Sequence, residues 1–156
     1  MSKTTKTIHI GADHRGYCLK FDLKQYLAKK GYNVVDQGNH SYQSSDDYPI
    51  FAKKVCQAVQ RNPKTNIGIL ICGSGIGMDI AANKFRCLRA ALCWNSLVAR
   101  AARNDDDPHI LVLPADFMNK VVARQTITAF LKTPFSGKTK NRRRLKLIKS
   151  IERCKN

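Results

Sequence analysis

The sequence lacks any apolar run long enough to cross a lipid bilayer, which excludes a membrane-spanning helix. Its six cysteines include no C-x-x-C pair and no zinc-type spacing, and several lie in apolar stretches where a free thiol behaves as a small hydrophobe. We therefore expect no metal, no cofactor and no disulfide. Because no signal-peptide core follows the basic start at residues 1–6, we also expect a cytoplasmic protein.

Acidic residues are scarce, because 11 Asp and Glu stand against 28 Lys and Arg, which gives a formal net charge of +17. Residues 132–156 alone hold ten Lys or Arg and one Glu. This basic segment suits an anionic partner such as a phosphorylated metabolite, nucleic acid or an acidic subunit face. The helix expected at about 141–154 has no interleaved aromatic residues for base stacking, so nucleic-acid binding should be absent or non-specific.

Short β-rich runs alternate with helical patterns along the chain. Strands are expected at 7–10, 32–36, 66–72, 90–94 and 110–113, with helices between them and Pro49 opening the helix that ends near residue 61. We predict one domain, residues 1–156, with an α/β fold of the Rossmann-like three-layer type. It has a parallel sheet of about five strands, covered on both faces, and the basic C-terminal helix.

Three unusual turns, at residues 11–16, 72–77 and 103–109, follow or precede predicted strands. Ligands of parallel α/β sheets bind outside the carboxyl ends of the strands. We expect all three turns to lie at that edge of the sheet, and their convergence predicts a functional site there.

The turn Cys72-Gly73-Ser74-Gly75-Ile76-Gly77 ends the most apolar predicted strand. Its glycines let the backbone approach a ligand closely, and successive amides at the next helix start form a nest for an anion. The positive helix end is expected to lower the pKa of Cys72 and favour its thiolate. A dinucleotide site is not indicated, because Met78 takes the third glycine position of that fingerprint. A tight turn around a buried, inert cysteine is the alternative.

The turn Gly11-Ala12-Asp13-His14-Arg15-Gly16 places a carboxylate, an imidazole and a guanidinium after the first predicted strand. Asp13 can exchange protons with a sugar hydroxyl, whereas His14 and Arg15 can face a phosphate. The alternative is that Asp13 only caps the next helix, as Asp readily does.

These segments resemble the signature of the ribose-5-phosphate isomerase B family. The resemblance is carried by residues 11–16, Asp47-Tyr48-Pro49, residues 68–77 and Ala81-Ala82-Asn83-Lys84, and it covers the chain from about Thr7 to the C-terminus. It implies a metal-free aldose–ketose isomerase of the pentose phosphate pathway that interconverts ribose 5-phosphate and ribulose 5-phosphate. It also implies a homodimer or homotetramer with each site between two subunits. Isomerisation of a six-carbon sugar phosphate, as by the related galactose-6-phosphate isomerase subunits, and non-catalytic sugar-phosphate binding stay open.

The resemblance also implies a role for each matching residue. Cys72 moves a proton between C2 and C1 of the open-chain sugar, and Ser74 with the amides of residues 73–77 holds the enediolate oxyanion. Asp13 positions the sugar hydroxyls. Tyr48 lines the pocket. His14 and Arg144 grip the phosphate.

The sequence departs from the family at the ring-opening residue. Counting without gaps from Cys72, the family histidine corresponds to Asp105. An aspartate can still act as acid or base, but its unperturbed pKa of about 4 suits ring opening less well. His109, four residues further on, is the alternative.

The phosphate-binding segment departs as well. The family's Arg-His-x-x-Arg motif corresponds to a segment that begins Lys140-Asn141 and ends at Arg144, and Asp116 falls where the family often carries an arginine. Lysine retains the charge of arginine but not its bidentate fork. Because the proton-transfer and anion-binding segments are intact, we expect an active enzyme with a shifted pH dependence or sugar preference.

Overall fold

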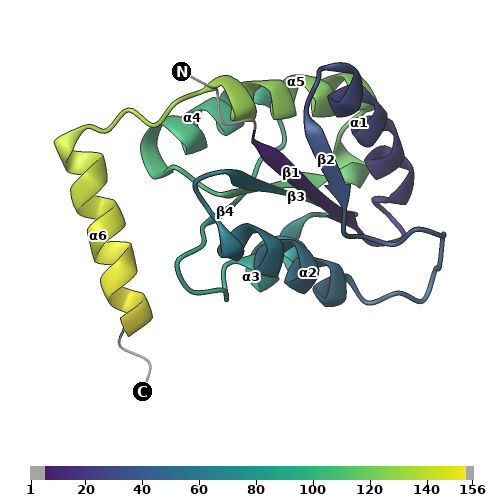
Figure 1. Cartoon of the computed structure of the whole chain (residues 1–156), viewed down its shortest axis with the longest axis horizontal. Coiled ribbons are helices and arrows are strands. Elements are labelled where there is room, and N and C mark those ends of the chain that lie inside the picture. Colours follow the sequence, from purple (N-terminus) through teal and green to yellow (C-terminus); the bar gives the residue numbers. More distant parts are fainter. Residues whose placement is uncertain (1–5, 154–156) are drawn as a thin grey trace.

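The computed structural model describes residues 6–153 and shows one parallel sheet with helices on both faces (Figure 1). The strands are β1 (Thr7–Ala12), β2 (Asn33–Asp36), β3 (Asn66–Cys72), β4 (Ala90–Leu92) and β5 (Ile110–Pro114). The helices are α1 (Tyr17–Lys29), α2 (Tyr48–Arg61), α3 (Ile76–Ala82), α4 (Ser96–Asp106), α5 (Lys120–Lys132) and α6 (Thr139–Arg153), with a 3-10 turn, η1 (Ala115–Phe117). The predicted fold class is confirmed. The predicted end of the last helix, residue 154, lies outside the described residues.

The central strand explains how the two layers of helices are held. Along β3, Ile67, Ile69 and Ile71 face the core beneath α1, α4 and α5, whereas Leu70 and Cys72 face the core beneath α2 and α3. This alternation follows from the two-residue repeat of a strand. Burying each large apolar side chain contributes roughly 1.5–3 kcal/mol, so the apolar run that predicted this strand fixes both layers.

In the strand order β2-β1-β3-β5-β4, the chain adds β2 on one side of β1 and β3 on the other. The switch point of this parallel sheet therefore lies between β1 and β3. Ala12 pairs with Ile71 in the ladder, and the Asp13 amide donates to the Ile71 carbonyl across 3.3 Å. Gly11 and Ala12, expected in the turn, are the last residues of β1. The turns after β1 and β3 therefore meet at the switch point, which is the usual ligand position of such sheets.

The turn at residues 103–109 lies at the opposite edge of the sheet, so its predicted position is wrong. It connects the end of α4 to the start of β5, and the His109 carbonyl accepts a hydrogen bond from the Gly68 amide at 3.0 Å. Gly68 precedes Cys72 by four residues of strand, which is roughly 13 Å. A crossover helix returns the chain to the amino end of the next parallel strand, and this turn completes that return.

Helix α6 projects from the body of the molecule (Figure 1) and contacts α4. At its start, Asn141 Nδ2 donates to Asp105 Oδ1 across 3.0 Å. Near its end, the Glu152 carboxylate accepts from the Cys87 amide at 3.1 Å. Leu147 and Ile151, one turn apart, are 60% and 67% exposed. No helix within residues 6–153 is long and apolar enough to cross a membrane.

Candidate active site

Residues 72–77 form an amide-lined cradle at the carboxyl end of β3. Gly75 precedes α3 with a φ of 78°, a left-handed conformation that glycine adopts without strain. Its amide donates to Cys72 Sγ at 3.2 Å, and the Ile76 amide donates to Ser74 Oγ at 3.3 Å. The cysteine sulfur is therefore joined to the same run of amides that can bind an anion.

The Cys72 thiol is nearly enclosed, since the residue is 5% exposed and packs with the core on the α2 and α3 face. Burial raises the pKa of this thiol above its ordinary value, and the negative charge of Asp13 adds to the rise. Hydrogen bonds from the Met78 and Gly75 amides act in the opposite direction without reversing the shift. The expectation of a lowered pKa is thus wrong for this chain, because desolvation outweighs the helix end.

Asp13 is the second buried ionisable residue at this edge, with 6% exposure. Its Oδ1 accepts hydrogen bonds from the Arg15 amide at 3.1 Å and the Gly16 amide at 3.0 Å. Burial raises the pKa of Asp13, while those amides and the neighbouring His14 lower it less strongly. Both bonds end on Oδ1 and organise the turn before α1.

His14 is held by Asp46, a residue that the sequence reading missed. Asp46 Oδ1 lies 2.7 Å from His14 Nδ1 and accepts from the His14 amide at 3.1 Å. Burial opposes the charge of Asp46, but the hydrogen bonds from His14 and Asn39 outweigh it and lower the Asp46 pKa. A carboxylate at Nδ1 leaves the far ring nitrogen available for an anion. The one indication of Asp46 in the sequence was its position directly before Asp47-Tyr48-Pro49.

Arg15 lies across the cradle rather than free in solution, because it forms an ion pair with Asp116. The Asp116 amide also donates to the Gly73 carbonyl at 3.0 Å. A Cβ on Gly73 would lie 2.6 Å from Arg15 Nε and 2.7 Å from Asp116 Oδ2, so a side chain at this position would push the ion pair aside. Arg15 is more than half exposed, so this pair contributes little to the stability of the fold. Its effect is to hold the Arg15 guanidinium next to the cradle.

Tyr48, the first residue of α2, forms a wall of the same edge. A Cβ on Gly77 would lie 2.5 Å from the Tyr48 ring carbon Cζ, which shows that the ring rests directly on this glycine. The side chain remains 39% exposed. The Tyr48 ring therefore lies next to residues 72–77 within the single chain, and its role in lining a sugar pocket stays a prediction.

The remaining predicted site residues do not meet Cys72 within one chain. Asp105 is exposed at the end of α4 and bonded to Asn141, and Lys140 and Arg144 are exposed on α6. His109 is partly buried at the start of β5, where its Nδ1 accepts from the Arg89 amide at 3.2 Å. Burial lowers the pKa of His109 to about 4, with Arg89 adding to the shift. His109 therefore has a structural contact at the edge opposite Cys72.

No cluster of three or more His, Cys, Asp or Glu side chains able to hold a metal ion occurs within residues 6–153. The cradle, the buried carboxyl of Asp13 and the His14 imidazole provide a base, hydrogen-bond donors for an oxyanion and a ring nitrogen that can contact an anion. These are the parts needed to move a proton on a phosphorylated substrate.

Comparison with known proteins places the chain in a family. Residues 8–148 match the family model described as ribose/galactose isomerase. The ribose-5-phosphate isomerase B of Escherichia coli is 34% identical over 151 residues, which cover 97% of this chain and 99% of that protein.

Solved structures show the same likeness. A Mycoplasma genitalium ribose-5-phosphate isomerase B with bound ribulose 5-phosphate superposes with a TM-score of 0.93 at 36% identity, covering 97% of this chain and 99% of that one. A Thermotoga maritima ribose 5-phosphate isomerase gives a TM-score of 0.88 at 43% identity, covering 93% and 98% of the two chains. Fold and sequence thus agree along nearly the whole chain, which belongs to the ribose/galactose isomerase family.

Proposed function

We propose that this chain is an aldose–ketose isomerase that interconverts ribose 5-phosphate and ribulose 5-phosphate with Cys72 as the base. The observation that carries the proposal is the position of Cys72 Sγ, 3.2 Å from the Gly75 amide and beside the buried carboxyl of Asp13. The names of the relatives and the ligand of the M. genitalium structure support the choice of sugar.

The chemistry is a proton transfer without net oxidation. The thiolate of Cys72 removes the proton from C2 of the open-chain aldose, and the electrons move onto the carbonyl oxygen at C1 to give an enediolate. The amides of residues 73–77 and the Ser74 hydroxyl stabilise the growing negative charge. The hydroxyl proton at C2 then passes to the oxygen at C1, and return of the first proton from Cys72 to carbon C1 gives the ketose. Asp13 holds the sugar hydroxyls, and His14 binds the phosphate.

A second copy of the chain completes the site in this proposal. Asp105, Lys140 and Arg144 are exposed and lie away from Cys72 in one chain, which suits residues that serve a neighbouring subunit. The exposed apolar residues Leu147 and Ile151 on α6 give that subunit a surface to cover. Asp105 then opens the sugar ring, and Lys140 and Arg144 add positive charge at the phosphate. A homodimer is the smallest assembly that meets this requirement, and a homotetramer meets it as well.

We also infer a cytoplasmic location. The five cysteines within residues 6–153 are all free thiols, as expected in a reducing compartment.

The direct test supplies purified protein with ribose 5-phosphate and, separately, with several hexose 6-phosphates, without added metal. Formation of ribulose 5-phosphate alone is the expected result. Faster conversion of a hexose 6-phosphate would show that the substrate is a six-carbon sugar phosphate and not ribose 5-phosphate. Saturable binding without conversion would instead show a sugar-phosphate-binding protein.

Mixing two inactive variants tests the shared site. Cys72→Ala and Arg144→Ala damage opposite sides of the proposed interface, so a mixed dimer of the two retains one site with both residues intact. Refolding an equal mixture is expected to recover about a quarter of the wild-type activity from statistical pairing. If both residues served the same chain's site, every site in the mixture would be damaged and no activity would return.

A further inference from the structure

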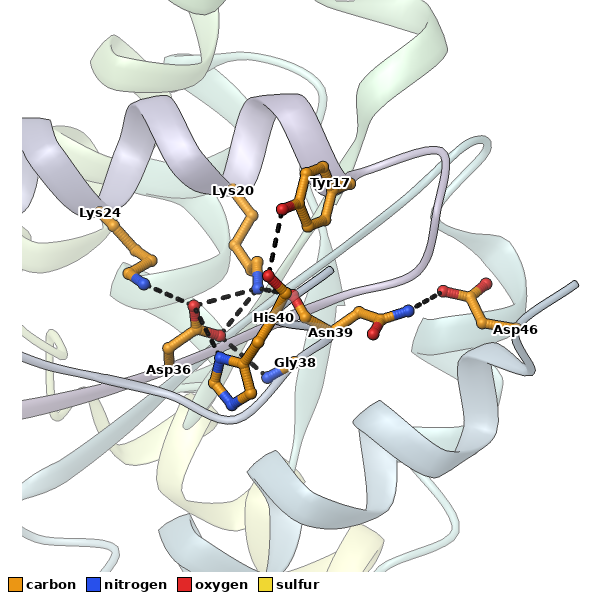
Figure 2. A network of polar contacts seen from close by, with 8 residues as sticks. All are labelled: Tyr17, Lys20, Lys24, Asp36, Gly38, Asn39, His40 and Asp46. Carbon is orange, nitrogen blue, oxygen red and sulfur yellow. Dashed lines mark hydrogen bonds and ion pairs between the residues drawn. The ribbon is translucent and has the colours of Figure 1, made fainter. Parts of the chain in front are cut away.

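The loop at residues 37–47, which carries Asp46, is tied to α1 by a network of polar contacts (Figure 2). Lys20 on α1 is 2% exposed, although lysine is rarely buried to this extent. Its Nζ donates to Asp36 at 2.8 and 3.0 Å and to the Asn39 carbonyl at 2.6 Å. Burying an ammonium group costs several kcal/mol unless it is paired, and these acceptors satisfy it.

The contacts continue from Lys20 to His14, the residue proposed to bind the phosphate. Asn39 Nδ2 donates to Asp46 Oδ2 at 3.0 Å, and Asp46 Oδ1 lies 2.7 Å from His14 Nδ1. Figure 2 shows this order, from Lys20 through Asn39 to Asp46. Each oxygen of Asp46 thus has a different partner, which fixes the carboxylate in both position and rotation.

The backbone of the loop is held by Asp36 as well, the same carboxylate that pairs with Lys20. The Gly38 amide donates to Asp36 Oδ1 at 3.0 Å, and a Cβ on Gly38 would lie 2.6 Å from the Ala12 nitrogen. The loop therefore packs against the end of β1, directly before the turn that holds His14. Residues 41–45 beyond it are exposed, and two further contacts reach this part of the loop: the Tyr17 hydroxyl donates to the His40 carbonyl at 3.2 Å, and the Tyr42 ring lies edge-on to His14.

We propose that Lys20 is a positioning residue that fixes His14 for phosphate binding through Asn39 and Asp46. This inference rests on the proposed function, because it assigns His14 to the substrate phosphate. Lys20 touches no substrate and acts only by holding the loop. Its effect should therefore fall on substrate affinity, while the proton transfer at Cys72 remains as it is.

Lys24 supplies a matched control on the same helix. Its Nζ lies 2.5 Å from Asp36 Oδ2, so it reaches the same carboxylate as Lys20. Among residues 6–153, however, the polar contacts of Lys24 do not extend to the loop at 37–47. Lys20→Met and Lys24→Met each remove one positive charge from Asp36, and only the first also removes the contact with Asn39.

Steady-state kinetics with ribose 5-phosphate provide the first measurement. Lys20→Met is expected to raise KM about fivefold to twentyfold with kcat within about twofold of wild type. Asn39→Ala removes only the contact with Asp46 and should give the same pattern without disturbing the buried lysine, so the test stands if Lys20→Met folds poorly. Lys24→Met should leave both constants within about twofold of wild type.

Hydrogen exchange of the His14 amide provides a readout without substrate, because that amide donates to Asp46 at 3.1 Å. Exchange should accelerate in Lys20→Met and Asn39→Ala and stay at the wild-type rate in Lys24→Met. Equal effects of the two lysine variants, or faster exchange with an unchanged KM, would overturn the positioning role. If the wild-type chain converts no sugar phosphate, the proposed function fails, and unchanged exchange at His14 would separately refute the connection to Lys20.

Discussion

The Gly75 amide donates a hydrogen bond to Cys72 Sγ across 3.2 Å, and this contact joins the buried thiol to the amide cradle that follows it. The same backbone segment therefore touches the proposed base and offers donors to the oxyanion that the base creates. Burial raises the pKa of the thiol, while the amides stabilise its charged form. The site combines a strongly basic sulfur with donors that act when negative charge develops.

Replacing the thiol should remove catalysis and leave the fold intact. Cys72→Ala is expected to lower kcat about 10²- to 10⁴-fold, the usual contribution of a positioned base, as measured by ketose formation. Cys56→Ala is the matched control, since Cys56 is a fully buried cysteine in the same core cluster but on α2. It should lose stability to a similar extent and retain turnover. Comparable turnover in the two variants would rule out Cys72 as the base.

The rate should rise with pH well above neutrality. The thiol must lose its proton to act as a base, and burial raises the pKa of Cys72 above its ordinary 9.0. Below that pKa the thiolate fraction grows about tenfold per pH unit, so kcat/KM should climb from pH 7 to 9. A profile that is flat across this range would show that the thiolate is already formed or is not required.

Removing a neighbouring negative charge should move that profile. The carboxylate of Asp116 contributes to the raised pKa of Cys72, after burial and the charge of Asp13. Asp116→Asn is therefore expected to shift the rising limb toward lower pH, and the shift should be small because Asp116 is exposed. Lys24→Met, a charge change far from the thiol on α1, serves as the control. A shift toward higher pH in Asp116→Asn would contradict the assigned cause.

Gly77 and Tyr48 should behave as a coupled pair. In Gly77→Ala the new methyl group would meet the Tyr48 ring, which must move away from the cradle, and KM should rise about tenfold. In a Tyr48→Ala background the ring is gone, so adding Gly77→Ala should cost little more. Steady-state kinetics of both single variants and the double variant complete the cycle. Strictly additive effects would show that the contact does not shape the site.

His109 should make stability depend on pH without taking part in catalysis. Burial lowers its pKa to about 4 in the folded chain from the ordinary 6.5, so the unfolded chain binds the proton more readily. The free energy of unfolding should therefore fall as the pH drops from about 6.5 to about 4, by at most about 1.4 kcal/mol per unit of pKa difference. Urea unfolding at several pH values measures this loss.

His109→Asn keeps a side-chain oxygen near the Nδ1 position for the Arg89 amide but cannot titrate there. It should flatten the stability profile in this pH window and leave isomerisation unchanged. Loss of turnover in this variant would restore His109 as a ring-opening candidate, served from a second copy of the chain.

The sequence alone determined the layered α/β fold and the segments that form the candidate site. Apolar runs and helical periodicity depend on neighbours along the chain, so β3 and α2 appear where the pattern predicts them. The placement of Cys72 beside Asp13 also followed, because the carboxyl ends of parallel strands share one edge. The glycine spacing after Cys72 also predicted the amide cradle, because the conformation of that turn depends on residues adjacent in sequence.

Tertiary structure decided the rest. Asp46 reaches His14 across 32 positions of sequence, and no local pattern encodes that approach. The turn at 103–109 lies at the far edge because helix α4 returns the chain there, and the pKa of Cys72 rises because packing removes water from the thiol. Desolvation and long-range contacts depend on which residues pack together in the folded chain, and the local sequence pattern does not determine that packing.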